Sequence, residues 1–174
     1  MASANELSGC SPKRLWDEYE HTLHRAEDGT ITAHHSIPLQ CIEVTILGRS
    51  FTCILDQGAE IIVMHKDIWQ SLGIPLRSDH VMTMESANKS KDAMLGVIEN
   101  LGFDFGGGEI QLQVQVIKKA PFKILLGRPF YAHTSCVTRD TINGDQNITL
   151  SDPNTGKEIT IATRNWLKVL GPGF

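Results

Sequence analysis

The chain has 174 residues, 41% of them hydrophobic and 21% charged, a composition typical of a globular domain that excludes a chain disordered throughout. Its net charge of −4, with only short basic clusters, predicts neither a nucleic acid nor an anionic membrane surface as a partner. No apolar run approaches the ~20 residues of a membrane span, and the polar N-terminus lacks the apolar segment of a signal peptide. We therefore expect a cytoplasmic or nuclear protein.

The potential metal ligands are scattered along the chain. His34 and His35 are neighbours, and neighbouring residues on a strand point to opposite faces, so the pair is poorly placed to hold one ion. The four cysteines are far apart and include no Cys-x-x-Cys pair: Cys10, Cys41, Cys53 and Cys136. We expect no metal, no disulfide framework and no cofactor, and we expect Cys53 and Cys136 to pack as small apolar side chains.

The N-terminal region combines a polar start with a predicted helix. Residues 1–11 are small and polar, and we expect them to be loosely held. A helix is predicted over residues 12–27, with Ser11 as its N-cap and Pro12 at its first position, and residues 28–30 are expected to end it. The apolar residues that recur there at helical spacing are Leu15, Trp16, Tyr19 and Leu23.

A β-hairpin is predicted next, and it leads to an acidic turn. Residues 39–47 include an alternating stretch, residues 48–50 form a turn, and residues 51–55 form an apolar strand. The strand ends at Asp56-Gln57-Gly58-Ala59-Glu60, and a second apolar β-type run covers residues 61–64. Taken alone, this pattern fits equally well an acid presented for chemistry and a hairpin corner whose aspartate caps the turn.

Residues 65–117 alternate between β-type runs and strong turn signals. A short helix is predicted over residues 65–72, closed by Gly73. Residues 76–85 and 93–98 are interpreted as the arms of a long hairpin with a polar tip. After the glycines at 106–108, residues 109–117 alternate strictly, which predicts a strand with one apolar face and an opposite face that carries Gln111, Gln113 and Gln115.

The last part of the chain is again β-rich. Residues 122–126 form a short apolar run before Gly127, and Pro129 suits the start of one helical turn over residues 130–133. Three further strands are expected at residues 136–139, 147–150 and 158–161. The fold class is mainly β, a closed or sandwich-like barrel with one or two short helices. We divide the chain into a partly helical N-terminal extension (1–36), a β domain (37–163) and a C-terminal tail (164–174).

An acidic turn, a polar-tipped hairpin and an Ile-Leu-Leu-Gly-Arg run follow one another in this all-β chain. That order resembles the retropepsin-like aspartic proteases, and most of all their retrotransposon-type domains. The resemblance implies an acid-protease barrel in which Asp56 is the catalytic aspartate, Gly58 contacts the acid through its backbone, and Ala59 lines the substrate groove. It also implies a supporting set and a substrate-binding flap: Glu60, Leu125, Leu126, Gly127 and Arg128 for the support, and Met84, Glu85, Ser86, Ala87 and Asn88 for the flap.

The resemblance further implies an endopeptidase that works as a homodimer. Two carboxylates share a proton around the attacking water in such chemistry, so each chain would supply one Asp56. The expected substrate is a peptide or polyprotein, such as that of a retroelement. Within each chain, we expect the guanidinium group of Arg128 to pair with the carboxylate of Glu60.

Gln57 departs from the family pattern, which has threonine or serine at this position. A small hydroxyl there links the two active-site loops of the dimer, whereas glutamine is larger and carries an amide. Two alternatives therefore stay open beside the protease. One is a catalytically inactive retropepsin-like module for dimerisation or peptide binding, and the other is an unrelated β-barrel with a chance Asp-Gln-Gly-Ala.

Overall fold

The computed structural model describes residues 24–79 and 94–167. The chain divides into two compact units. The first comprises Met1–Pro38 together with Asp140–Asp145, and the second comprises Leu39–Arg139 together with Gln146–Phe174. The second unit holds the acidic turn.

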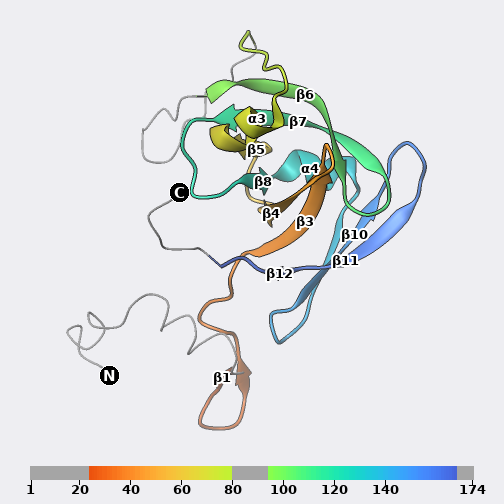
Figure 1. Cartoon of the computed structure of the whole chain (residues 1–174). Helices are drawn as coiled ribbons and strands as arrows, with labels where there is room; N and C mark the ends of the chain where they lie inside the picture. Colours follow the sequence, from red (N-terminus) through yellow and green to blue (C-terminus); the bar gives the residue numbers. More distant parts are fainter. Residues whose placement is uncertain (1–23, 80–93, 168–174) are drawn as a thin grey trace, which may run out of the picture. The chain divides into compact units, whose positions relative to one another are not determined.

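The second unit is built on a closed β-barrel (Figure 1). Its sheet has the strand order β12-β3-β4-β8-β5-β7-β6, and pairing of Thr45 in β3 with Asp104 in β6 closes six of these strands into a ring. The strands are β3 (Gln40–Ile46), β4 (Arg49–Leu55), β5 (Val63–His65), β6 (Met94–Asp104), β7 (Glu109–Ile117), β8 (Ile124–Leu126) and β12 (Arg164–Asn165). The prediction of a mainly β barrel with short helices is confirmed.

Turn chemistry sets the register of the hairpin that carries the acid. Leu47 and Gly48 both have positive φ, 49° and 77°, as a two-residue hairpin turn of the primed type requires. Arg49 already pairs with Ile46, so the turn consists of Leu47 and Gly48 and begins one residue before the predicted turn at residues 48–50. The inward side chains of the barrel are apolar and buried, and they include Ile42, Val44, Ile46, Phe51, Cys53 and Leu55. Cys53 is fully buried, as predicted.

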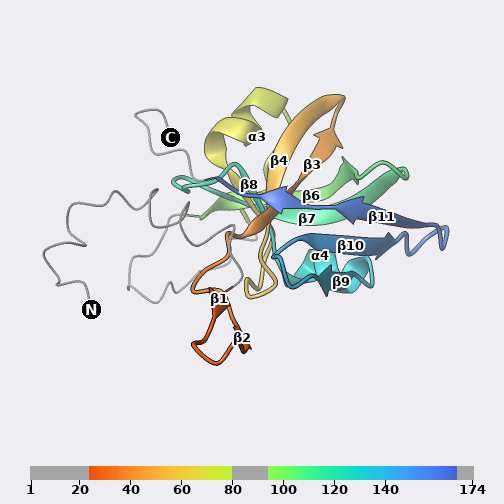
Figure 2. The same ribbon diagram turned by 90° about the horizontal axis from the view of Figure 1, so that it is seen from below.

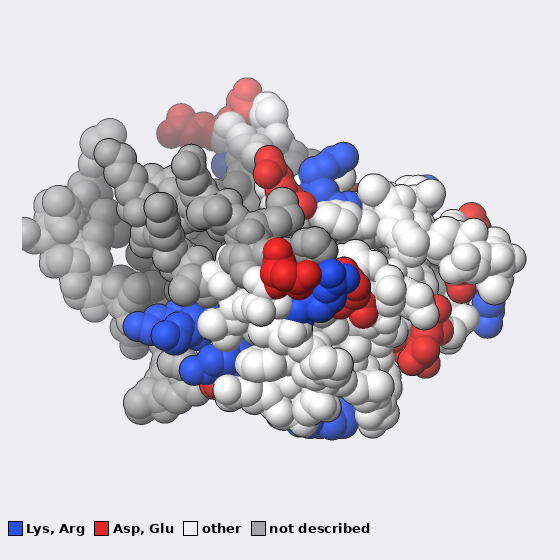
Figure 3. Space-filling model, turned by 90° about the horizontal axis from the view of Figure 1, so that it is seen from above, with Lys and Arg blue, Asp and Glu red and all other residues white. Residues whose placement is uncertain are grey.

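The strand β6 pairs along its length with β7 around the turn at Gly106 and Gly108. The predicted pairing of residues 76–85 with 93–98 is reduced, among the described residues, to a single bridge between Arg77 and Val97. Arg77 also forms ion pairs with Asp79 and Glu99. Acidic and basic groups lie side by side on the face of the molecule in Figure 3, where neither sign predominates.

The alternation predicted for β7 holds only as far as Val114. Gln115 was expected on the outer face, yet it is buried, with 7% of its surface exposed. The cause is β5, since Val63 lies opposite Gln115 in the parallel pair β5–β7. A second apolar cluster, centred on Val63, Met94 and Ile117, forms on this side of the sheet. Both faces of the strand are therefore covered at this end.

Two short helices and a second sheet complete the described part of this unit. The helix α3 (Lys66–Leu72) ends at Gly73, whose φ of 66° is left-handed, and the predicted helix at 65–72 is thus present. The helix α4 (Arg128–His133) lies against a three-stranded sheet of order β11-β10-β9 (Figure 2). These strands are β9 (Val137–Asp140), β10 (Gln146–Ser151) and β11 (Glu158–Ala162). Phe130 of α4 is fully buried in the same core as Ile148 and Leu150.

The first unit contains a small hairpin of β1 (His24–Arg25) and β2 (Ile31–Thr32). The helix predicted over residues 12–27 is therefore wrong at its end. The amide N–H of Thr30 donates to the Asp28 side chain over 2.9 Å, and Gly29 has a φ of 87°, so a tight turn reverses the chain here. The rest of that prediction lies outside the described residues. Over the described ranges, no helix has the length and apolar character needed to cross a membrane.

Candidate active site

The acidic turn is held in place by β8, which lies between two strands joined by that turn. β8 runs parallel to β4, with Leu55 opposite Leu126, and antiparallel to β5, with Val63 opposite Leu125. The loop of residues 56–62 must therefore cross the end of β8 to pass from β4 to β5. This crossing brings Asp56 next to Gly127, far along the sequence.

Asp56 continues the ladder of β4 by one residue. Its N–H donates to the carbonyl oxygen of Leu126 over 3.1 Å, and its own carbonyl accepts from Ala59 over 3.2 Å. Its carboxylate oxygen Oδ1 accepts from the N–H of Gly58 over 3.0 Å. A Cβ on Gly58 would lie 3.2 Å from that oxygen, so glycine leaves room for the carboxylate. Asp56 and Ala59 are half-buried, and Gln57 and Gly58 are exposed.

The backbone of the loop passes so near Gly127 that only glycine fits there. A Cβ at this position would lie 2.0 Å from the carbonyl oxygen of Ile61 and 2.8 Å from that of Ala59. The next residue, Arg128, donates its N–H to the Ala59 carbonyl over 2.7 Å. Leu126 is fully buried beneath this crossing, and Leu125 is half-buried on the opposite face. The Leu-Leu-Gly-Arg run thus supports the acidic turn mainly through its backbone.

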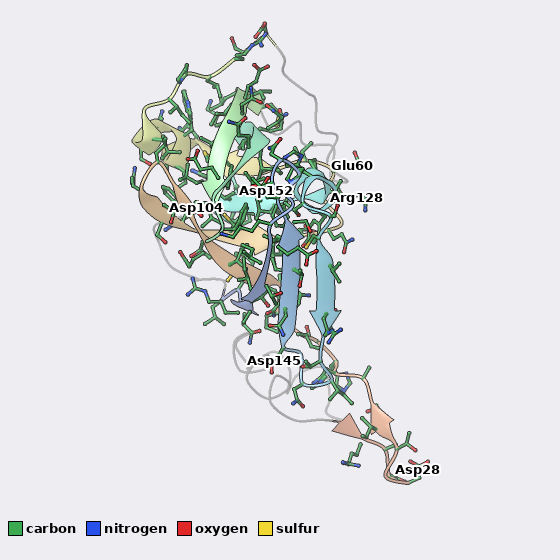
Figure 4. The ribbon with its side chains drawn as sticks, turned by 90° about the vertical axis from the view of Figure 1, so that its right-hand side faces the viewer. Asp28, Glu60, Asp104, Arg128, Asp145 and Asp152 are labelled. Atoms are coloured by element: carbon green, nitrogen blue, oxygen red, sulfur yellow. The ribbon has the colours of Figure 1, made fainter. Side chains whose placement is uncertain are left out.

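The predicted side-chain pair of Glu60 and Arg128 is absent from the structure. Figure 4 shows both residues at the same edge of the barrel, but both side chains are exposed and they form no ion pair with each other. This prediction is therefore wrong for the single chain. The two segments are joined instead by the backbone bond from Arg128 to Ala59, since backbone groups at a crossing are closer than the ends of two long solvated side chains.

Comparison with known proteins settles the family. The profile described as "Aspartyl protease" matches residues 42–130, a little over half of the chain, and this range contains both Asp56 and Gly127. The chain belongs to the aspartyl protease family. The match also takes in Arg128 and most of α4, so the acidic turn and its support fall within one family region. Among curated proteins, a search finds no match.

A solved structure shows the same fold. The retroviral protease-like domain of Ddi1 from Leishmania major is similar over 77% of this chain and 98% of that domain, with a TM-score of 0.55 and 15% identity. A retropepsin-like aspartic protease from Rickettsia conorii is similar over 80% of this chain and 90% of its own, with a TM-score of 0.49 and 18% identity. The similarity to the Ddi1 domain, together with the closed sheet described above, shows that this aspartyl protease family member has the barrel fold of a retroviral protease-like domain.

The predicted flap residues Met84, Glu85, Ser86, Ala87 and Asn88 lie outside the described residues. Sequence reasoning missed Tyr131, a residue of α4 that lies near enough to Asp56 for their charges to interact. Burial, together with the nearby Cys136 and Asp56, raises the pKa of the Tyr131 hydroxyl. Its ring packs edge-to-face on Phe130 at a centroid distance of 5.3 Å. The sequence could have pointed to Tyr131 through its place in the predicted helical turn over residues 130–133, three residues after Arg128.

The raised pKa of Tyr131 predicts a loss of stability at high pH. Above pH about 10, the ordinary tyrosine value, the unfolded chain releases the proton while the folded chain retains it, so the free energy of unfolding falls as pH rises. Tyr131→Phe should reduce that loss and leave stability near neutral pH nearly unchanged. Denaturant unfolding of both proteins across alkaline pH measures this. An equal loss of unfolding free energy in the wild type and in Tyr131→Phe would show that Tyr131 is not the group responsible.

Proposed function

We propose that this member of the aspartyl protease family is an endopeptidase of the retropepsin type that acts as a symmetric homodimer on peptide or polyprotein substrates. The observation that carries the proposal is the state of Asp56, a half-exposed carboxylate that is fixed at a strand end by the N–H of Gly58. The chain contains a single Asp-Gln-Gly-Ala turn. A two-carboxylate site therefore calls for a second copy.

Each Asp56 would take one of two roles in the dimer. The ionised carboxylate accepts a proton from the attacking water, while the protonated carboxyl of the other chain donates a hydrogen bond to the scissile carbonyl. The proton then moves to the leaving amine. The backbone bonds that hold the loop supply positioning, because a carboxylate in a fixed place needs no reorganisation during the reaction. The expected activity lies on the acidic side of neutrality, where one of two close carboxyl groups is protonated.

Gln57 supports a second candidate function, a retropepsin-like module that binds peptides or dimerises without cleaving. Its side chain is exposed beside Asp56, where it would meet a second copy. A glutamine amide occupies more space there than the hydroxyl of threonine or serine, and such a residue can hold two acidic turns apart. The two candidates share the fold and differ in whether two carboxylates reach one water.

The test is cleavage of a peptide library from acid to neutral pH, with the oligomeric state measured in parallel by analytical ultracentrifugation. We expect a dimer and cleavage that depends on Asp56. Binding of library peptides without cleavage at any pH would favour the inactive module. Cleavage that survives Asp56→Asn would exclude the proposed mechanism altogether.

Gln57→Thr separates the two candidates further. We expect the substitution to tighten the dimer and to raise kcat/KM by about tenfold, because a small hydroxyl lets the two turns approach. The dimer dissociation constant and the cleavage rate are measured on the same preparations. If both values match those of the wild type, Gln57 limits neither dimerisation nor activity.

A further inference from the structure

A hollow of about 350 Å³ opens on the outer face of the barrel sheet. Its floor is formed by Cys41, Thr52 and Ile54, and its walls by residues 121–123 and 164–167. Cys41 lies directly opposite Ile54 in the β3–β4 pair, so both project from the same face. None of these residues belongs to the support of the acidic turn described above.

The floor of this hollow continues to Asp56. Side chains alternate along a strand, so Thr52, Ile54 and Asp56 share one face of β4. Leu125 lies opposite Ile54 on the neighbouring β8 and shares that face. Ile54 and Asp56 are two positions apart along the strand, which is a rise of about 7 Å. An extended peptide bound across Asp56 covers that distance with two residues.

Each wall carries large apolar side chains and is attached to the barrel. Phe122 packs in the second apolar cluster together with Leu125, which links the wall to the face that carries Asp56. On the other side, the N–H of Trp166 donates to the Leu39 carbonyl over 2.7 Å. Leu167 is 70% exposed and borders the hollow. The two residues that follow β12, Trp166 and Leu167, therefore add two large apolar side chains to this wall.

The anchoring of β12 is built from side chains as well as backbone. Arg164 and Asn165 pair with Cys41 and Gln40 of β3. The Gln40 amide donates to the Asn165 side chain over 2.9 Å, and Gln40 accepts from Thr163 over 2.7 Å. Such a set of bonds holds the wall in place before any ligand arrives.

The rim carries two cations and one anion. Arg164 bonds to Glu43 and to Thr52, so its charge is largely met within the chain. The Thr52 hydroxyl lowers the pKa of Glu43 most, and Arg164 and Lys123 lower it further. Lys123 is exposed on the wall opposite β12. The rim is thus positive overall, with Lys123 as its outer cation.

We propose that this hollow is an outer subsite of the peptide-binding site. It takes a bulky apolar side chain of the peptide, two or three residues from the cleaved bond. The same peptide carries a carboxylate that faces Lys123. The proposal rests on the proposed function. The occupant follows from the continuity of the floor with Asp56, from the apolar walls and from the positive rim. A general apolar docking surface would not be aligned with the acidic turn.

Two variants test the two parts of this subsite. Trp166→Ala enlarges the hollow, and we expect the preference for a bulky over a small apolar side chain at the affected position to fall about tenfold. Lys123→Glu reverses the outer charge, and we expect the preference for an acidic over a basic residue to reverse, with a change of about tenfold or more. Lys157→Glu changes an exposed lysine in the β10–β11 turn, outside this hollow, and should leave both preferences unchanged.

Each variant is checked for folding by circular dichroism and is then profiled twice with the same positional library. One profile measures cleavage, and the other measures peptide binding to the same variants in the Asp56→Asn background by fluorescence anisotropy. Altered binding preferences without any wild-type cleavage would support the subsite and reject the endopeptidase. Preferences that stay unchanged in folded Trp166→Ala and Lys123→Glu, or a wild type that binds no library peptide, would overturn the subsite.

Discussion

Asp56→Asn is expected to abolish peptide cleavage, with a loss of about 10³-fold or more, because an amide neither accepts the proton of the water nor supplies a carboxyl proton. The fold should survive, since the asparagine oxygen still accepts the N–H of Gly58 that Asp56 Oδ1 now accepts over 3.0 Å. The measurement is kcat/KM on a cleaved library peptide, with the unfolding midpoint of each variant as a check.

The chain offers a matched control for this variant at Asp104. Its carboxylate accepts the N–H of Gly106 over 2.7 Å, the same two-residue contact that Asp56 makes with Gly58 (Asp104 is labelled in Figure 4). Asp104→Asn thus makes the same chemical change in a second Asp-x-Gly turn and should keep nearly full activity. Equal losses in the two variants would mean that the effect is one of stability, and would remove Asp56 from the reaction.

Gly127→Ala is expected to destabilise the protein by about 3 kcal/mol, because the added Cβ would lie 2.0 Å from the Ile61 carbonyl oxygen and neither backbone segment can yield cheaply. For a chain of this length that corresponds to a melting temperature roughly 10 °C lower. Cleavage should fall as well, because separating Gly127 from the loop moves Asp56. Thermal unfolding and cleavage are measured on the same preparation.

Gly102→Ala is the matched control for that change. A Cβ there would meet the carboxylate of Glu109 at 2.7 Å, but Glu109 is an exposed side chain that can turn away. We expect a stability change within about 0.5 kcal/mol of the wild type. If Gly127→Ala were as mild as Gly102→Ala, the close crossing of residues 56–62 over β8 would not be present in solution.

Local chemistry made several elements predictable from the sequence. Alternation identified the strands around Val44 and Ile110, and glycines that need a positive φ identified the turns at Gly73 and Gly106. The acid at the end of a buried strand was visible for the same reason, since a run of apolar residues before Asp56 has no other place than the core. Each of these features depends on residues that are neighbours in sequence.

Contacts between distant segments were not predictable in this way. The burial of Gln115 depends on β5, and the wall of the hollow depends on β12, which lay in the expected C-terminal tail. The hairpin at His24–Arg25 replaced the end of a predicted helix, because a turn at Gly29 pairs those residues with Ile31–Thr32. Periodicity gives the face of a residue, whereas the partner on that face is decided by strand order.

The sequence by itself determined that this protein is mainly β with one acidic turn at the end of a buried strand, because alternation and turn residues act over a few positions. Only the tertiary structure decided what holds that turn. The insertion of β8 between β4 and β5 brings Gly127 against Ile61, and backbone bonds across that crossing replace the expected pair of Glu60 and Arg128. Such a crossing is long-range, so its partners are selected by packing of the whole barrel.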